Sequence, residues 1–487
     1  MKSSQPTRVR YVVLAFVASL SMITYLDRAA FPNVQDNVRS ALGLATLADL
    51  WLPFTIFQFS YAIFEIPTGW LGDVFGPRKT LIRIVLWWSF FIAVTGLAGE
   101  ISGVSLFGSK LTSFTIYGFT GLVAVRFLFG IGEAGAYPNI ARAIYNWFPL
   151  RERGRASGVV WLTARLMGGL TPLIMTVLLT QFGFHWRSVF FLFGSLGVIW
   201  CIAFAIWFRN RPDEKPEVND AERELIAADH GPEQVHSGVP WKKILKNRNV
   251  WALSLMYFCT NYGWYFNMNY LPGFLQDHFG VQMSSLVGSI YKGGPLLLGM
   301  FGCFLGGLAT DWYVHRTRDR KWGRRICGIA GHGLCGLCML SLVLIPAQPL
   351  FAWLFALLIA LAGFFNDMTM ASAWSACQDV GRRYSAIVSA TMNTIGNLGG
   401  ALTTVLSGLI VKWQIHAYAQ GAGTEANILN NTQSMRPILL EAERAGWHLN
   451  FIIYGCVYLL AVVFWLMLDA GKPVEPEQVV GPVVEPA

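Results

Sequence analysis

The sequence predicts an all-α membrane protein with twelve transmembrane helices in two six-helix bundles. Of its 487 residues, 54% are hydrophobic and only 13% are charged, which is unusual for a soluble protein of this length. Apolar runs of about 20 residues recur along the chain, each long enough to cross a bilayer as a helix. A glycine-rich basic loop at residues 69–79 returns in degenerate form at 306–325, about half a chain later, which indicates an internal repeat.

The apolar runs place the expected spans in order. Six precede a polar middle segment: residues 11–31, 50–71, 80–97, 126–149, 156–179 and 187–208. A loop is expected at 98–114. Six more follow the polar segment: residues 250–279, a span from about 284, one ending near 345, 350–377, one containing SATMNTIGNLGG, and a last one after a polar loop at 414–447.

These spans divide the chain into four parts. Residues 1–208 are expected to form the first bundle and 248–470 the second. Residues 209–247 form a cytoplasmic linker, in which Asn219 and Glu222 have the spacing of a capping box for a short helix. The Pro-, Val- and Glu-rich residues 471–487 predict a disordered cytoplasmic tail.

The basic residues set the expected orientation. Most of the 37 Lys and Arg fall in alternate loops, so the positive-inside rule puts both termini in the cytosol and the protein in the cell (inner) membrane. Because the net charge of +9 is distributed in this way, we expect the lipid bilayer and no nucleic acid as a partner. Cys335 and Cys338 form a CxxC inside an apolar run, which we interpret as two small buried residues. No metal site and no cofactor other than a coupling proton is expected.

One charged stretch organises the rest of the chain. In RFLFGIGEAGAYP, Arg126 and Glu133 lie about two helical turns apart, so both face the same side of one buried helix. Ionisable residues inside a membrane are costly and indicate a functional site. The small residues between them allow a neighbouring helix to approach closely.

Other charges lie within the expected spans. The bases are Arg28, Arg126, Arg165 and Lys292, and the acids are Asp27, Glu65, Glu133 and Asp367. Each alone has an alternative interpretation as a structural ion pair or as a long side chain that reaches the interface. Together they sum to zero, so protonating an acid leaves a positive surplus that an anion would cancel. Proton and anion binding would then favour each other, which predicts proton–anion symport.

Polar and aromatic residues on four of the expected spans suit a hydroxylated ligand. Tyr257, Asn261, Trp264 and Tyr265 share the seventh span, Asn393 and Asn397 lie one turn apart on the eleventh, Tyr61 lies beside Glu65, and Asn366 precedes Asp367. Hydroxyls, amides and flat apolar faces together favour binding of a sugar acid. The alternative is an aromatic packing face with an interfacial belt.

Two sets of motifs resemble known families. The loop GWLGDVFGPRK is similar to the signature loop of the major facilitator superfamily, whose role is gating; the matching positions are Gly69, Asp73, Gly76 and Arg78, with Asp311 and Arg324 in the repeat. TYLDR in the first span, the stretch from Arg126, and ERGRASG after it resemble the anion:cation symporter family. That family includes bacterial sugar-acid transporters and, more distantly, sialin and the vesicular glutamate transporters.

The resemblance implies roles for particular residues. It implies proton coupling by Asp27 and Glu133, with Arg28 linking the proton and substrate states. It implies that Arg126 helps to hold the substrate carboxylate and that Tyr61 and Asn393 line the cavity. Arg165 replaces a polar amide of the sugar-acid members, Lys292 and Asp367 are additional charges, and Glu65 replaces a neutral polar residue.

The sequence leaves several functions open. The leading hypothesis is a monomeric, proton-coupled importer of a sugar acid such as a hexonate or hexarate. The additional charges keep open a dicarboxylate, an aromatic acid or a phosphorylated acid. Drug efflux by proton antiport is a further alternative, against which the buried bases argue. A membrane enzyme or sensor is disfavoured because catalytic motifs such as HExxH and the nucleophile elbow are missing from the sequence.

Overall fold

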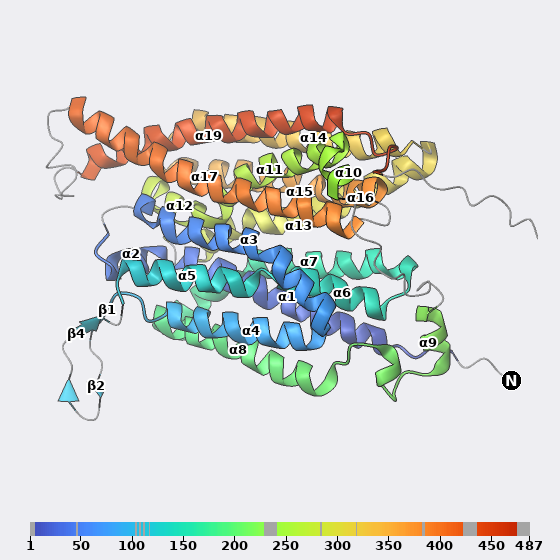
Figure 1. Cartoon of the computed structure of the whole chain (residues 1–487). Coiled ribbons are helices and arrows are strands. Elements are labelled where there is room, and N and C mark those ends of the chain that lie inside the picture. The colour runs from blue at the N-terminus through green and yellow to red at the C-terminus, as the bar shows by residue number, and fades with distance from the viewer. Residues whose placement is uncertain are drawn as a thin grey trace, which may run out of the picture.

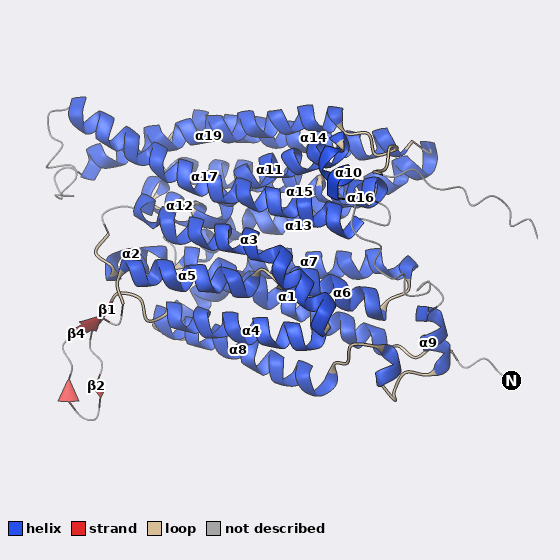
Figure 2. Ribbon diagram, viewed as in Figure 1, coloured by secondary structure: helices blue, strands red, loops and turns tan. Residues whose placement is uncertain are grey.

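Long, nearly parallel helices dominate the computed structural model (Figures 1 and 2). It describes residues 5–44, 47–102, 105–106, 109–110, 113–115, 117–227, 241–282, 285–317, 319–381, 385–421 and 436–474. Figure 1 shows the helices of the N-terminal half together in the lower part of the view and those of the C-terminal half in the upper part. The predicted helical membrane fold is therefore confirmed, while the boundaries at residues 208 and 248 stay predictions.

The N-terminal half consists of long helices that alternate with shorter helical segments. Its helices are α1 (Val9–Asn33), α2 (Gln35–Ala41), η1 (Leu47–Leu50), α3 (Trp51–Phe75), α4 (Pro77–Thr95), α5 (Phe119–Glu133), α6 (Ala136–Trp147), α7 (Leu150–Thr176), η2 (Val177–Gln181) and α8 (Trp186–Trp207). The segment that follows contains η3 (Pro212–Glu214), α9 (Asp220–Ala227) and α10 (Trp241–Lys246).

The C-terminal half has the same succession of long helices. They are α11 (Arg248–Asn269), α12 (Leu271–Phe279), α13 (Leu286–Thr317), α14 (Arg320–Ser341), η4 (Leu342–Leu344), η5 (Pro349–Phe351), α15 (Ala352–Met368), α16 (Met370–Gly381), α17 (Ser385–Gly421) and α19 (Arg436–Met467). In the described part of the chain, nine helical segments are long and apolar enough to cross a membrane. The long helices α3, α4 and α11 run alongside them, and the count of twelve spans stays a prediction.

Three spans that we expected to be continuous are broken. The span predicted at 126–149 starts earlier and divides into α5 and α6, because Pro138 has no N–H to donate to the carbonyl of Ala134. The span predicted at 250–279 divides into α11 and α12 just before Pro272 for the same reason. The span predicted at 350–377 divides at Thr369, whose hydroxyl and amide both bond back to the carbonyl of Asn366.

Two expected loops differ from the prediction. The segment predicted as a loop at 98–114 contains the short strands β1 (Glu100–Ser102), β2 (Ser105–Leu106), β3 (Ser109–Lys110) and β4 (Ser113–Thr115). β1 pairs antiparallel with β4, and β2 with β3. The loop predicted at 414–447 is shortened at both ends, since α17 continues to Gly421 and α19 begins at Arg436. Residues 475–487 of the tail that is predicted to be disordered lie outside the described residues.

The linker docks on the end of the first helix. Asn219 caps α9 by accepting a hydrogen bond from the amide of Glu222 at 2.9 Å, as the capping box predicts. The Glu222 carboxylate does not close the box but pairs with Arg10 at 2.8 Å. This burial of an ion pair attaches the linker to the end of α1.

The signature loops act through their backbone and their arginines. Gly76 has φ 78°, a conformation that favours glycine, and the amide of Arg78 donates to the side chain of Asn210 at 3.0 Å. In the repeat, Arg324 pairs with Asp379 at 3.0 Å. The side chains of Asp73 and Asp311 lie outside the described residues, so their gating roles stay predictions.

Candidate functional site

The predicted membrane charges lie where the two halves face each other or just inside one half. All of the eight charged side chains except Arg28 are below one-tenth exposed. The structure divides them among two ion pairs, one carboxyl held by amides, and groups with few polar partners. Each arrangement has a different consequence for transport.

Arg28 and Glu133 form an ion pair inside the N-terminal half. The Nε of Arg28 on α1 lies 2.7 Å from Oε1 of Glu133 at the end of α5. The face of the Tyr61 ring lies 4.5 Å from the Arg28 guanidinium carbon. The structure thus brings these three predicted residues together, while the proton-coupling roles of Glu133 and Arg28 and the cavity-lining role of Tyr61 stay predictions.

Asp27 lies beside this pair without joining it. It is 1% exposed and forms no ion pair with a described residue, and its polar neighbour is the indole of Trp88 on α4. Burial of a carboxylate is costly unless a cation balances it, so Asp27 differs from Glu133, which Arg28 contacts.

Arg126 does not contact Glu133, although both lie on α5. Its guanidinium carbon lies 4.7, 4.6 and 5.1 Å from the ring centroids of Phe31, Phe57 and Phe129. Its Nε and Nη1 are buried and have no hydrogen-bond partner. Aromatic faces stabilise a cation but leave its N–H donors unused, so the substrate-binding role of Arg126 stays a prediction that its two unpartnered nitrogens are compatible with.

Arg165 and Asp367 form the second ion pair, and it joins the two halves. The Nε of Arg165 on α7 lies 2.8 Å from Oδ2 of Asp367 on α15, and Nη2 donates to Oδ1 at 3.0 Å. Nη1 donates to the hydroxyl of Tyr25 at 3.0 Å, and the guanidinium lies 4.7 Å from the ring of Trp264. Asn366 donates to Oδ1 of Asp367 at 3.0 Å.

Glu65 makes a second contact between the halves. Its carboxylate on α3 accepts hydrogen bonds from the amides of Asn393 at 2.5 Å and Asn397 at 3.4 Å, both on α17. The hydroxyl of Tyr265 donates to the oxygen of Asn397 at 3.2 Å. The two amides predicted to bind substrate are thus occupied by a carboxylate of the protein itself.

The remaining predicted residues are buried nearby. Tyr257 packs edge-on against Trp374 and Asn261 lies close to Gly396, both in the C-terminal half. Lys292 is 5% exposed on α13. Tyr25 was not among the predicted site residues. Its hydroxyl accepts a hydrogen bond from Arg165, and its ring faces the guanidinium of Arg28. Its position in the TYLDR motif was the available signal.

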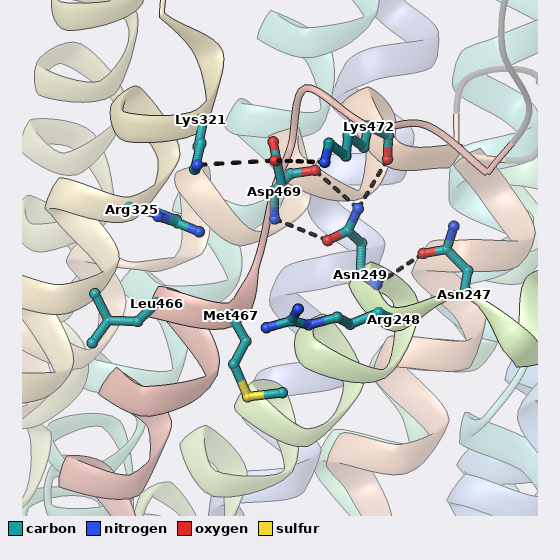
Figure 3. A pocket seen from close by; sticks show the side chains of 9 residues that line it. All are labelled: Asn247, Arg248, Asn249, Lys321, Arg325, Leu466, Met467, Asp469 and Lys472. Atoms are coloured by element: carbon teal, nitrogen blue, oxygen red, sulfur yellow. Dashed lines mark hydrogen bonds and ion pairs between the residues drawn. The ribbon is translucent and has the colours of Figure 1, made fainter.

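A separate hollow lies at the ends of α11, α14 and α19 (Figure 3). Its charged lining consists of Arg248, Lys321, Arg325, Lys472 and one acid, Asp469. Figure 3 shows Asn249 bonded to the backbone beside Asp469, which fixes the chain after α19. None of the predicted substrate residues lines this hollow, so it is distinct from the site between the halves.

Buried charges between two halves of a helical membrane protein define a transporter that carries a polar solute. A family model described as the Major Facilitator Superfamily matches residues 17–404. The chain belongs to the Major Facilitator Superfamily. It is a multi-pass membrane transporter and not an enzyme, and the resemblance to its anion transporters is confirmed by the relatives below.

Three relatives span most of the chain. A probable sulfoacetate transporter, SauU, of Cupriavidus necator is 29% identical over 84% of this chain and 89% of its own length. A probable galactarate/D-glucarate transporter, GudP, of Bacillus subtilis is 29% identical over 84% of this chain and 87% of its own. A probable chloroplastic anion transporter of Oryza sativa is 30% identical over 96% of this chain and 70% of its own.

Solved structures show the same fold. A bacterial homolog of the human lysosomal transporter Spinster, crystallised in an inward-facing and occupied conformation, superposes with a TM-score of 0.70 at 19% identity. The match covers 94% of this chain and 96% of that one. At this identity the likeness concerns the fold alone.

Proposed function

We propose that this protein imports a small organic anion, in the first place a sugar acid such as a hexonate or hexarate, together with protons. The observation that carries the proposal is Arg126, whose buried guanidinium has two nitrogens without hydrogen-bond partners. An anion that enters the space between the halves would supply those missing acceptors. A carboxylate matches the planar fork of arginine especially well.

The relatives support the same class of substrate. Relatives of this chain are named as transporters of galactarate/D-glucarate, of L-galactonate and of hexuronate, and these solutes are all small carboxylates. The amides of Asn393 and Asn397 beside Glu65, and the hydroxyl of Tyr265 next to them, suit the hydroxyl groups of such acids. We propose an inner-membrane monomer with both termini in the cytoplasm, as the distribution of basic residues favours.

Proton coupling is proposed from the carboxyl groups of the N-terminal half. Asp27 is buried and forms no ion pair with a described residue, and Glu133 holds Arg28 at 2.7 Å. Protonation of Glu133 would free Arg28, and protonation of Asp27 would remove an unfavourable buried charge. Both changes make the N-terminal half more positive, which favours an incoming anion.

The test is uptake by purified protein in liposomes. The rate of D-glucarate uptake should rise when the outside is acidified. In Glu133→Gln this pH-dependent rise should be at least tenfold smaller than in the wild type. Uptake that ignores the pH gradient in the wild type, and that Glu133→Gln leaves unchanged, would contradict the proposal.

A short dianion is the second candidate substrate. It is favoured by the similarity to the probable sulfoacetate transporter and by Arg165, which adds a second buried base to Arg126. Thermal-shift measurements with D-glucarate and sulfoacetate decide between them, because a ligand that binds only the folded state raises the melting temperature.

A further inference from the structure

The Arg165–Asp367 pair resembles a bound substrate carboxylate. Nη2 donates a hydrogen bond to Oδ1 at 3.0 Å, and Nε on the same edge of the guanidinium lies 2.8 Å from Oδ2, an ion-pair contact in which Oδ2 accepts no hydrogen bond. Arginine also recognises the carboxylates of ligands along this planar edge. Arg165 therefore already displays, with a carboxylate of the protein, the contact that it would make with a substrate.

The pair also lies across the boundary that transport must open. Arg165 is on α7 in the lower group of helices in Figure 1, and Asp367 is on α15 in the upper group. Alternating access requires the two halves to rock against each other around the site between them. By contrast, the Arg28–Glu133 pair joins α1 and α5 within one half, so rocking does not have to separate it.

Separating the pair without compensation is costly. Asp367 is fully buried and Arg165 is 7% exposed, and removing one partner of such a pair leaves an uncompensated buried charge, which is strongly destabilising. Other titratable groups that face Asp367 are Cys303 on α13, Cys335 on α14 and Tyr458 on α19, and none of them is a cation. Asp367 can leave Arg165 at low cost only if it becomes neutral.

The other contact between the halves does not impose this condition. Glu65 is held by the neutral amides of Asn393 and Asn397, so separating it leaves no cation without a counter-ion. Among the described contacts within the membrane core, the Arg165–Asp367 pair is therefore the contact whose separation, when the halves open, leaves a cation without its counter-ion.

From these contacts we infer that the substrate anion displaces Asp367 from Arg165 and that Asp367 takes up a proton in the same step. The charge of the site is zero before the exchange, with one cation and one carboxylate. It is also zero afterwards, with one cation, one substrate carboxylate and one neutral acid. One proton accompanies each anionic group bound at Arg165, and Asp367 is a proton carrier in addition to Asp27 and Glu133. The inference rests on the proposed function.

The experiment separates exchange from coupling. Asparagine has the size of a protonated aspartate, so Asp367→Asn should behave as a permanently proton-loaded carrier. We expect counterflow of D-glucarate at equal pH to stay within about threefold of the wild type. Accumulation driven by a pH gradient should fall at least tenfold. Arg165→Gln should lose both activities.

The matched control is Glu222→Gln. It also removes a carboxylate from a buried ion pair, with Arg10 at 2.8 Å, but that pair lies at the end of α1, away from the site between the halves. It should keep gradient-driven accumulation. If Asp367→Asn accumulates substrate as the wild type does, the inference is wrong. If the wild type itself shows no gradient dependence, the proposed function fails first.

A binding measurement decides the case in which Asp367→Asn carries out neither activity. In the wild type, one-proton linkage predicts that the Kd for D-glucarate rises about tenfold per pH unit once Asp367 must be protonated for binding. In folded Asp367→Asn the slope of log Kd against pH should be smaller than in the wild type by the contribution of one linked proton. An unchanged pH slope in the variant would overturn the inference.

Discussion

Arg126 shows how one buried side chain can be stabilised while its hydrogen-bond donors stay available. Arg126 is 2% exposed and packs against three phenylalanine rings, while two of its nitrogens have no hydrogen-bond partner. Aromatic faces offset part of the cost of burying the cation. A permanent carboxylate partner would offset more of that cost, but it would also occupy the donors that an anion needs.

Arg126→Lys and Arg126→Gln test this interpretation. Lysine keeps the charge but loses the planar fork, so we expect the Kd for D-glucarate to rise more than tenfold. Glutamine removes the buried charge, so binding should be lost while the melting temperature without substrate stays equal or rises. Thermal-shift titration measures both quantities. A large fall in the melting temperature of Arg126→Gln would show that the arginine is mainly structural.

At the scale of helices, close approach depends on glycine. A Cβ at Gly293 on α13 would overlap the backbone carbonyl oxygen of Gly169 on α7, so these two helices from different halves meet backbone to backbone. The same contact region includes the hydrogen-bonded hydroxyls of Thr176 and Ser289, at 2.6 Å. Small residues at such contacts allow helices in a membrane to pack closely.

Gly293→Ala should push α7 and α13 apart. Overpacking of this kind costs about 1–3 kcal/mol, so the melting temperature should fall and D-glucarate counterflow should slow. Gly307→Ala on the same helix is the control, because its new methyl group would meet Ala371 at an ordinary 3.6 Å. Equal melting temperatures of the two variants would argue against a tight contact at Gly293.

For the whole molecule, the two halves are tied at one end by ion pairs. Lys412 on α17 lies 2.6 Å from Asp49 in η1, and Arg39 on α2 lies 4.0 Å from Asp277 on α12. Figure 1 shows α2 and α12 at the end of the bundle opposite to the N-terminus. This end must open during alternating access.

A reversible cross-link tests that motion. In a background without the native cysteines, Asp49→Cys and Lys412→Cys joined by a disulfide-containing thiol reagent should abolish transport, and a reductant should restore it. Asp220→Cys with Arg223→Cys is the control, since this ion-paired couple lies within α9 alone. Transport that survives the first cross-link would show that this end does not separate.

The local pattern of the sequence predicted much of this protein. Apolar runs predicted the helices, because a chain in a bilayer must satisfy its backbone polar groups within each segment. The charged positions in those runs marked residues that the structure buries between or within the halves. Pro138 and Pro272 could have predicted two of the helix breaks, since a missing N–H is a property of the sequence itself.

The pairing of those charges was decided only by the tertiary structure. The spacing of Arg126 and Glu133 suggested that they act together, yet Glu133 pairs with Arg28 and Arg126 with aromatic rings. Arg165 and Asp367 are about 200 residues apart, and Glu65 and Asn393 are more than 300 apart. Helical periodicity gives the face of a residue on its own helix and nothing about the helix opposite. The sequence by itself therefore determined which charges enter the membrane, and the packing of the two halves determined which of them pair within one half and which pair across the two halves.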